Sequence, residues 1–199
     1  MQIRPGFHRQ RPGGGFYPSP SRSLNAVHPA VTWARQRARI PHCRPRSPNL
    51  DLILWRHAEA EEGLPDLARK LTPRGQKHAA RIAEWLQQRL PAKFVVLASP
   101  AERTRQTALA LGVPFKTVHA LAPGASANDI LGAAEWPDRK DAVIVVGHQP
   151  DLGRTAAFLI SGRADDWTLK KGGLWWLTNR VRNDEAQVVV RATIAPDLL

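Results

Sequence analysis

The chain has 199 residues and a formal net charge of +12, and 43% of its residues are hydrophobic. This length allows one domain with a full hydrophobic core and a terminal extension. The single cysteine, Cys43, excludes an intrachain disulfide and a cysteine-based metal site, and no apolar run reaches the roughly 20 residues that a membrane-spanning helix needs. Because no secretory apolar segment follows Met1 either, these features favour a cytoplasmic location.

The positive charge is concentrated at the N-terminus. Residues 1–49 contain nine arginines, eight of the 17 prolines and no lysine, aspartate or glutamate, so they carry +9. Residues 50–199 hold 20 basic against 17 acidic side chains and carry only +3. We therefore predict a disordered basic Arg/Pro-rich extension, residues 1–49, followed by one folded domain, residues 50–199.

Three other interpretations of residues 1–49 fit the same composition. They are a basic arm that binds nucleic acid or an anionic membrane, an arginine-rich transit-like peptide, and a stretch that is not native. In the last case translation would start at Leu50 from a codon other than ATG, because Met1 is the only methionine. The composition favours disorder or a misplaced start, so neither nucleic acid nor a membrane is expected as a partner.

The folded part opens with an apolar run, residues 50–55, that ends abruptly in Arg56 and His57. The run lacks the alternation of a half-exposed strand, so we predict a strand buried on both faces. Two later runs, residues 94–98 and 142–146, have the same character. Strands of this kind are typical of parallel sheets that helices cover on both sides.

Helical patterns lie between and after these strands. Ser99 and Glu102 match a capping box, in which the two side chains satisfy the first backbone N–H groups of a helix. Comparable start signals are Thr72-Pro73, Ser126 with Asp129, and Pro150-Asp151. We predict four helices from these signals, at residues 73–90, from 100 onward, at 126–134 and at 151–160.

Strands therefore alternate with helices, and a hairpin closes the chain. The hairpin is expected to join residues 174–177 and 188–194 across a turn at Asn183-Asp184. This order predicts an α/β fold, a three-layer α/β/α sandwich with a mostly parallel central sheet. In such sheets ligands bind just beyond the carboxyl ends of the strands.

Polar side chains stand at that edge. Arg56 and His57 follow the first strand, Ser99 and Arg103 follow the second, and His148 follows the third. Two guanidinium groups and two imidazoles around one point would make an anion pocket with a nucleophile. The set is not rich in carboxylates and the chain has no Walker loop, so neither a metal nor another cofactor is implied.

These motifs resemble the histidine phosphatase superfamily. Arg56-His57-Ala58 resembles its Arg-His-Gly/Ala signature, Ser99-Pro100-x-x-Arg103-Thr104-x-Gln106-Thr107-Ala108 its second motif, and Gly147-His148 its third. The segment Asp66-x-x-Arg69-x-Leu71-Thr72-x-x-Gly75 is similar to the SixA-type branch, the phosphohistidine phosphatases. The resemblance runs from about Leu50 to the C-terminus and implies a phosphoglycerate mutase-like fold.

The resemblance also implies a role for each residue. His57 would attack phosphorus and become transiently phosphorylated, and Arg56, Arg103 and His148 would hold the phosphoryl oxygens, with Ser99 also at the substrate-binding site. These roles suit phosphoryl transfer, which depends on positioning and electrostatic stabilisation. His57 must present a neutral ring nitrogen, so its other nitrogen is expected to donate to a nearby backbone carbonyl.

The pattern leaves the proton donor open. Members of the superfamily that cleave phosphate esters use a carboxylate after the second helix, but residues 118–123 contain no acid. Glu59, Glu61, Asp66 or His119 would then have to supply the proton. A phosphohistidine needs such an acid less, because its leaving group is an imidazole whose conjugate acid has a pKa of about 6.5.

The sequence thus predicts a metal-independent phosphohistidine phosphatase. Residues 112–141 are too few for a large cap over the pocket, which suits a phosphorylated protein such as a histidine-phosphotransfer domain or a sugar-transport phosphocarrier. Two alternatives stay open. One is a small-molecule phosphomonoesterase of the same superfamily, and the other is a non-catalytic module that binds phosphate.

Overall fold

The computed structural model of the protein describes residues 50–182 and 185–199. The extension predicted for residues 1–49 and the turn predicted at Asn183-Asp184 lie outside the described residues. The elements in chain order are β1 (Leu50–Arg56), η1 (Asp66–Ala68), α2 (Pro73–Gln87), β2 (Phe94–Ala98), α3 (Glu102–Leu109), β3 (Lys116–Thr117), η2 (His119–Leu121), α4 (Ala127–Ala134), β4 (Ala142–Gly147), α5 (Asp151–Ser161), β5 (Leu174–Arg182), β6 (Glu185–Ile194) and η3 (Pro196–Leu198).

The strands form one six-stranded sheet in the order β3-β2-β4-β1-β5-β6. Strands β1, β2, β3 and β4 run parallel, whereas β5 and β6 add to the β1 side in antiparallel fashion. The predicted α/β fold with a mostly parallel sheet is confirmed. The sequence did not predict the short strand β3 or the three 3₁₀ helices η1, η2 and η3.

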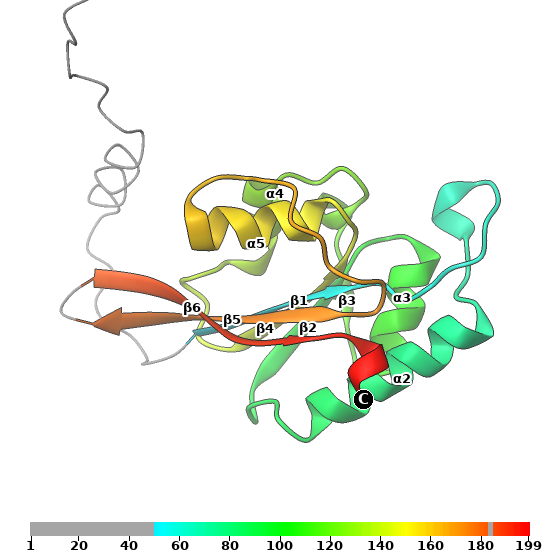
Figure 1. Cartoon of the computed structure of the whole chain (residues 1–199), viewed down its shortest axis with the longest axis horizontal. Helices are drawn as coiled ribbons and strands as arrows, with labels where there is room; N and C mark the ends of the chain where they lie inside the picture. The colour runs from blue at the N-terminus through cyan, green and yellow to red at the C-terminus, as the bar shows by residue number, and fades with distance from the viewer. Residues whose placement is uncertain (1–49, 183–184) are drawn as a thin grey trace, which may run out of the picture.

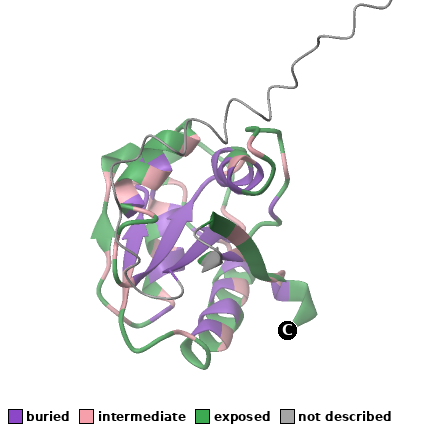
Figure 2. Ribbon diagram, turned by 90° about the vertical axis from the view of Figure 1, so that its left-hand side faces the viewer, coloured by how far each residue is buried: buried purple, intermediate pink, exposed green. Residues whose placement is uncertain are grey.

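Helices cover both faces of the sheet and complete three layers (Figure 1). On β1, the side chains of Ile53 and Trp55 pack in one core with α2 and α3, and those of Leu52 and Leu54 pack in another with α4 and α5. All four side chains are fully buried. Strands β1 and β4 accordingly form the buried centre of the domain (Figure 2), as the absence of alternation in residues 50–55 predicted for β1.

The register of the sheet brings three strand ends to one level. Arg56, the last residue of β1, pairs with Gly147, the last residue of β4. The next residue along, His57, donates its backbone N–H to the Gly147 carbonyl at 3.0 Å, and Ser99 donates to the Val146 carbonyl at 3.1 Å. The polar residues that follow β1, β2 and β4 therefore meet at the carboxyl edge of the sheet.

The helix starts agree with the sequence in three cases, including α5, which begins at Asp151, and differ in one. Thr72 caps α2 by accepting from the Gly75 N–H at 2.9 Å, and Ser126 forms a capping box with Asp129 at the start of α4. The capping box predicted for Ser99 and Glu102 is wrong, because α3 begins at Glu102 with Ala101 as its N-cap. The Ser99 hydroxyl instead lies 2.7 Å from His148 Nε2.

Gly75 lets α2 approach the segment that follows β1. A Cβ at this position would overlap the carbonyl oxygen of Glu59. The same carbonyl accepts a hydrogen bond of 3.0 Å from the Thr72 N–H. The glycine of the Leu-Thr-x-x-Gly segment is thus explained by close backbone approach, which only a residue without a side chain permits.

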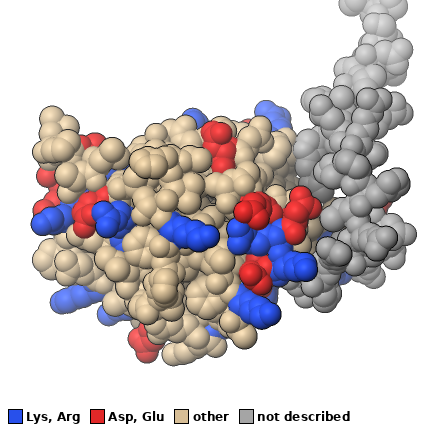
Figure 3. All heavy atoms as spheres, turned by 180° about the vertical axis from the view of Figure 1, so that it is seen from behind, with Lys and Arg blue, Asp and Glu red and all other residues tan. Residues whose placement is uncertain are grey.

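The surface of the folded part is electrostatically mixed. On the face seen in Figure 3, acidic and basic side chains are interspersed, as the near balance of charge over residues 50–199 predicts. Within the described ranges, no helix is long and apolar enough to cross a membrane.

Candidate functional site

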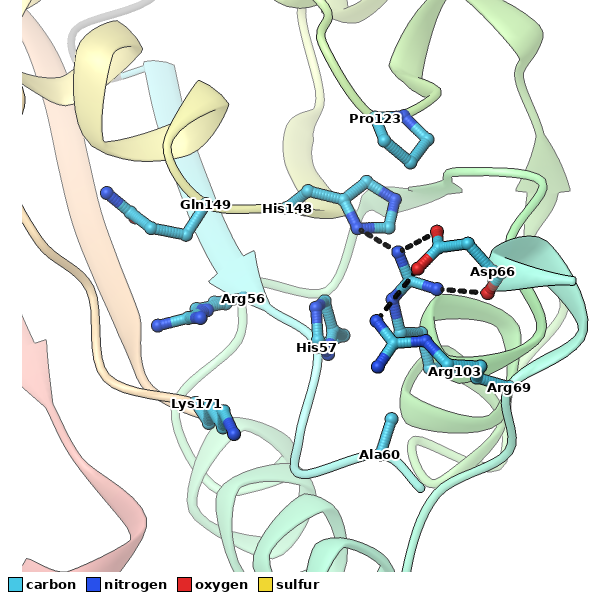
Figure 4. A pocket seen from close by; sticks show the side chains of 10 residues that line it. All are labelled: Arg56, His57, Ala60, Asp66, Arg69, Arg103, Pro123, His148, Gln149 and Lys171. Atoms are coloured by element: carbon cyan, nitrogen blue, oxygen red, sulfur yellow. Dashed lines mark hydrogen bonds and ion pairs between the residues drawn. The ribbon is translucent and has the colours of Figure 1, made fainter. Parts of the chain in front are cut away.

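A pocket of about 320 Å³ opens at the carboxyl edge of the sheet. Its lining comes from the ends of β1 and β4, from α3, from the loop before α2 and from the segment before β5 (Figure 4). The residues that line it are Arg56, His57, Ala60, Asp66, Arg69, Arg103, Pro123, His148, Gln149 and Lys171. Four cationic side chains in this set stand against one carboxylate, so the pocket suits an anion.

His57 lies in the middle of the pocket with 8% of its surface exposed. Its Nδ1 is 2.8 Å from the Ala58 carbonyl oxygen. A carbonyl can only accept, so Nδ1 carries the hydrogen and Nε2 keeps the lone pair. The predicted hydrogen bond to a nearby backbone carbonyl is confirmed, and it orients the ring for attack through Nε2.

The protonation state of His57 also suits a nucleophile. The pKa of His57 falls to about 4, mainly because the ring is buried; the hydrogen bond to the Ala58 carbonyl opposes this fall, and the positive charges of Arg103 and Arg56 add to it. The imidazole is therefore neutral at physiological pH, with Nε2 unprotonated. The backbone beneath it is held as well, because Thr107 Oγ1 accepts from the Ala58 N–H at 3.1 Å.

His148 faces His57 across the pocket, with the ring centroids 5.3 Å apart. Arg103 Nη2 donates to His148 Nδ1 at 3.4 Å, so His148 Nε2 bears the hydrogen that points to the Ser99 hydroxyl at 2.7 Å. Burial, followed by the proximity of His57 and Arg103, lowers the pKa of His148 to about 3. Both imidazoles are thus neutral before an anion enters.

Arg103 is 3% exposed and is held by the loop that carries Asp66. Its Nη1 donates to the Asp66 backbone carbonyl at 2.6 Å, and its Nη2 lies 2.9 Å from the Asp66 carboxylate. Arg69 forms a second ion pair with the same carboxylate at 2.9 Å. The hydrogen bond from Arg103 is the main reason why the pKa of Asp66 lies below its usual range, so this carboxylate is ionised at neutral pH.

Arg56 is oriented by one arm of its guanidinium group. Its Nη1 donates to the Leu169 carbonyl at 2.6 Å. Burial lowers the pKa of Arg56, but a guanidinium group stays charged at neutral pH. Its Nε is buried and has no hydrogen-bond partner among the described residues, as is also true of Arg103 Nε. Both groups therefore bring positive charge to the pocket that is only partly compensated by protein atoms.

Gln149 fixes the segment that orients Arg56. Its Nε2 donates to the Trp167 carbonyl at 2.7 Å, and its Oε1 accepts from the Leu169 N–H at 3.2 Å. The segment also lies directly against α5, since a Cβ on Gly153 would overlap the Trp167 carbonyl. A chain of contacts thus runs from the residue after His148, through residues 167–169, to Arg56.

The structure unites four of the five residues predicted from the sequence. Arg56, His57, Arg103 and His148 line one pocket. Ser99 does not line it, since it is fully buried and its hydroxyl contacts His148. The substrate contact expected for Ser99 is therefore corrected to a positioning contact, because the strand end places its side chain behind the imidazole.

Of the four proton donors that the sequence left open, the pocket includes Asp66. Glu59, Glu61 and His119 are not among its lining residues. Three further polar lining residues were not predicted: Arg69, Gln149 and Lys171. Arg69 stood within the segment similar to the SixA-type branch and Gln149 directly followed His148, so both carried a signal, whereas no sequence pattern marked Lys171.

The two buried histidines predict a loss of stability in mild acid. A histidine of the unfolded chain titrates near pH 6.5, whereas His57 and His148 titrate near 4 and 3 in the fold. Between about pH 6.5 and 4 the unfolded state binds protons that the folded state does not. The free energy of unfolding should therefore decrease as the pH is lowered through this range, by up to about 2.7 kcal/mol per pH unit for the two groups together.

Urea denaturation from pH 7 to 4.5 measures this slope. We expect His148→Asn to reduce it by about half, because one of the two groups is lost. His119→Ala is the control, since this histidine is exposed and its loss should leave the slope unchanged. A stability that is constant between pH 6.5 and 5 would contradict the neutral, buried state of both imidazoles.

Comparisons with known proteins agree with this geometry. The sequence model of the histidine phosphatase superfamily (branch 1) matches residues 52–122. An uncharacterized protein from Picosynechococcus sp. is 35% identical over 137 residues, which are 63% of this chain and 82% of that protein. The match thus covers most of the length of that relative.

Solved structures point the same way. A protein from Nakamurella multipartitia, solved under the name phosphohistidine phosphatase SixA, is 30% identical with a TM-score of 0.60, over 75% of this chain and 100% of that chain. The protein histidine phosphatase SixA complexed with tungstate has a TM-score of 0.64 over 75% of this chain and 99% of that chain, and at 20% identity it shows the fold alone. The predicted phosphoglycerate mutase-like fold is confirmed, and the comparisons support phosphatase activity. The chain belongs to the histidine phosphatase superfamily, in its SixA-like branch.

Proposed function

We propose that this protein is a metal-independent phosphohistidine phosphatase that hydrolyses phosphohistidine on another protein. The observation that carries the substrate class is the ion pair of 2.9 Å between Arg103 and Asp66, the only carboxylate among the described residues that line the pocket. An ester releases an alkoxide, which needs a proton from a nearby acid. A carboxylate held in its ionised form by Arg103 is a poor source of that proton.

A phosphohistidine avoids this demand. Nε2 of His57 attacks phosphorus in line, the phosphorus–nitrogen bond of the substrate breaks, and the electron pair leaves on an imidazole. If that imidazole entered protonated, it leaves neutral and no enzyme acid is needed. Water then attacks the phosphoryl group on His57, releasing inorganic phosphate and returning His57 to its neutral form.

The cationic side chains of the pocket support the rest of the proposal. Arg56, Arg69, Arg103 and Lys171 would stabilise the charge on the phosphoryl oxygens during both steps. In many other phosphoryl-transfer sites a divalent metal supplies part of this charge. Three guanidinium groups in one pocket can supply it instead, which is the reason for proposing a metal-independent reaction.

A phosphorylated protein is the substrate that we propose, either a histidine-phosphotransfer domain or a phosphocarrier of the cytoplasm. The observation behind it is the position of the pocket, whose wall on one side is the loop that carries Asp66 and whose wall on another side carries the exposed Lys171. A histidine side chain on a second protein can reach His57 between these walls.

The test is phosphate release from a phosphorylated histidine-phosphotransfer domain and from glycerol 2-phosphate, an ester whose alkoxide leaving group needs a proton, measured side by side. We expect release from the phosphohistidine and little from the ester. Comparable or faster release from the ester would reject the substrate class in favour of a small-molecule phosphomonoesterase. No release from any phosphorylated substrate, with retained phosphate binding, would favour a non-catalytic phosphate-binding module.

Gln149→Ala should weaken catalysis without removing any pocket charge. The variant loses both hydrogen bonds to residues 167–169, so the Leu169 carbonyl no longer holds Arg56 in place. We expect kcat/KM to fall by about tenfold, since a misplaced Arg56 guanidinium group should lose on the order of 1–2 kcal/mol of transition-state stabilisation. Steady-state kinetics with free phosphohistidine as substrate give the value.

A matched control exists on α2. Gln87 also makes a hydrogen bond from its side chain to a distant backbone carbonyl, that of Leu111 at 2.9 Å, but it is not part of the pocket. Gln87→Ala should leave kcat/KM within about twofold of the wild type. Equal losses in the two variants would mean that Gln149 acts through general stability and not through Arg56.

A further inference from the structure

A closed loop beside the pocket presents two leucines to solvent. The loop spans residues 61–70 and is tied at its base, where the Glu61 N–H donates to the Lys70 carbonyl at 2.8 Å. Figure 1 shows this segment, which includes η1, projecting from the body of the domain. Leu64 is 94% exposed and Leu67 is 50% exposed. Among the described large apolar side chains, none is more exposed than Leu64.

The same loop forms a wall of the pocket. Asp66 lies between the two leucines in sequence, and both its backbone and its carboxylate contact Arg103. Consecutive Cα atoms are about 3.8 Å apart, so Leu64 and Leu67 lie within about 8 Å of Asp66 along the backbone. A protein that brings a phosphorylated side chain to His57 along this wall would come close to these leucines.

The charges around the pocket define the rest of the partner's surface. Lys171 is exposed and lines the pocket on a side away from the loop (Figure 4). The loop itself carries the exposed acids Glu61 and Glu62 next to the exposed Lys70, so the charge at its base is mixed. Acidic side chains of a partner would be attracted near Lys171.

We propose that Leu64 and Leu67 form a docking surface for the protein that carries the phosphohistidine. The partner would place apolar side chains against the two leucines and acidic side chains next to Lys171. Exposed apolar side chains that gather beside a reactive pocket mark a protein interface, and a few central apolar residues carry most of the binding energy of an interface. This inference rests on the proposed function, because it assigns a surface to the protein substrate.

The experiment compares two substrates that differ in the presence of a protein surface. One is a histidine-phosphotransfer domain phosphorylated on its histidine, and the other is free phosphohistidine. The double variant Leu64→Ser/Leu67→Ser should lose at least about tenfold in kcat/KM for the protein, because two apolar contacts are removed. For free phosphohistidine, which reaches only the pocket, kcat/KM should stay within about twofold of the wild type.

Leu109→Ser is the matched control, because Leu109 is 59% exposed at the end of α3 and does not line the pocket. It should leave both activities within about twofold. Equal effects of the double variant on the two substrates, or no effect on either, would overturn the docking surface. Sedimentation of the wild type and the double variant tests a second copy as occupant: a dimer that the substitutions disrupt, with both activities intact, would also overturn it.

The experiment separates this inference from the proposed function. If the wild type hydrolyses free phosphohistidine but not the phosphorylated domain, the chemistry stands and the docking surface fails. If the wild type hydrolyses neither, the proposed function fails and the docking surface fails with it.

Discussion

Replacing His57 with alanine is expected to reduce phosphate release by at least about 10⁴-fold, because the attacking nitrogen is lost. His57 lies in the middle of the pocket, and its tautomer leaves Nε2 unprotonated. The four cationic side chains that line the pocket would still bind the phosphoryl group, so substrate binding should survive. Single-turnover assays with a phosphorylated histidine-phosphotransfer domain measure the loss of turnover, and equilibrium binding of inorganic phosphate measures what is retained.

A chemical trap gives an independent readout of the same variant. Quenching the wild-type reaction in alkali should leave a base-stable, acid-labile phosphoryl group on the enzyme, as expected for phosphohistidine. The His57→Ala variant should carry none. His78→Ala, a change on α2 outside the pocket, should behave like the wild type in both assays. Turnover or trapped phosphate in His57→Ala at wild-type levels would reject His57 as the nucleophile.

Arg103→Lys should cost about 10²-fold in kcat even though it keeps the positive charge. The Arg103 guanidinium reaches the Asp66 carbonyl, the Asp66 carboxylate and His148 Nδ1 at the same time. A lysine ammonium is a compact point charge without a planar fork, so it cannot satisfy these partners and two phosphoryl oxygens in one geometry. The loss should appear mainly in kcat, because the charge on phosphorus is spread most widely in the transition state.

The same helix supplies the control for Arg103. Arg105 is exposed and pairs at 3.5 Å with Glu102, away from the pocket. Arg105→Lys should leave kcat within about twofold, since exposed ion pairs contribute little. If Arg103→Lys were as active as Arg105→Lys, the fork geometry of Arg103 would be irrelevant and only its charge would matter.

The pocket combines neutral imidazoles with an ionised carboxylate. Burial is the main reason why the pKa of His57 is lowered, and the guanidinium groups of Arg103 and Arg56 add to it, while the hydrogen bond from Arg103 lowers the pKa of Asp66. The site is therefore organised to bind negative charge while the His57 ring stays neutral and nucleophilic.

Much of the fold could be predicted from local patterns. Residues 50–55 lack alternation because both faces of β1 are covered, and the Thr72-Pro73 signal marks the true start of α2. The failure at Ser99 has a clear cause. Its sequence context satisfies the capping-box pattern, but its hydroxyl is used by His148, a residue 49 positions away, and local propensity contains no information about that contact.

The site, like the fold, has features that the sequence determines and features that only the tertiary structure decides. The sequence by itself determined which chemically active side chains follow the strands, namely Arg56, His57, Arg103 and His148, because strand ends and helix starts are encoded locally. Parallel strands then bring such residues to one edge of the sheet wherever the chain can form right-handed crossovers.

Only the tertiary structure decided how these side chains are set for chemistry. The ion pair of Asp66 with Arg103, the Leu169 carbonyl that holds Arg56, and the place of Lys171 at the pocket all join segments far apart in the sequence. Protonation states follow from these contacts and from burial, which no short stretch of sequence contains. The composition of the site is thus a local property of the chain, whereas its electrostatics belong to the folded molecule.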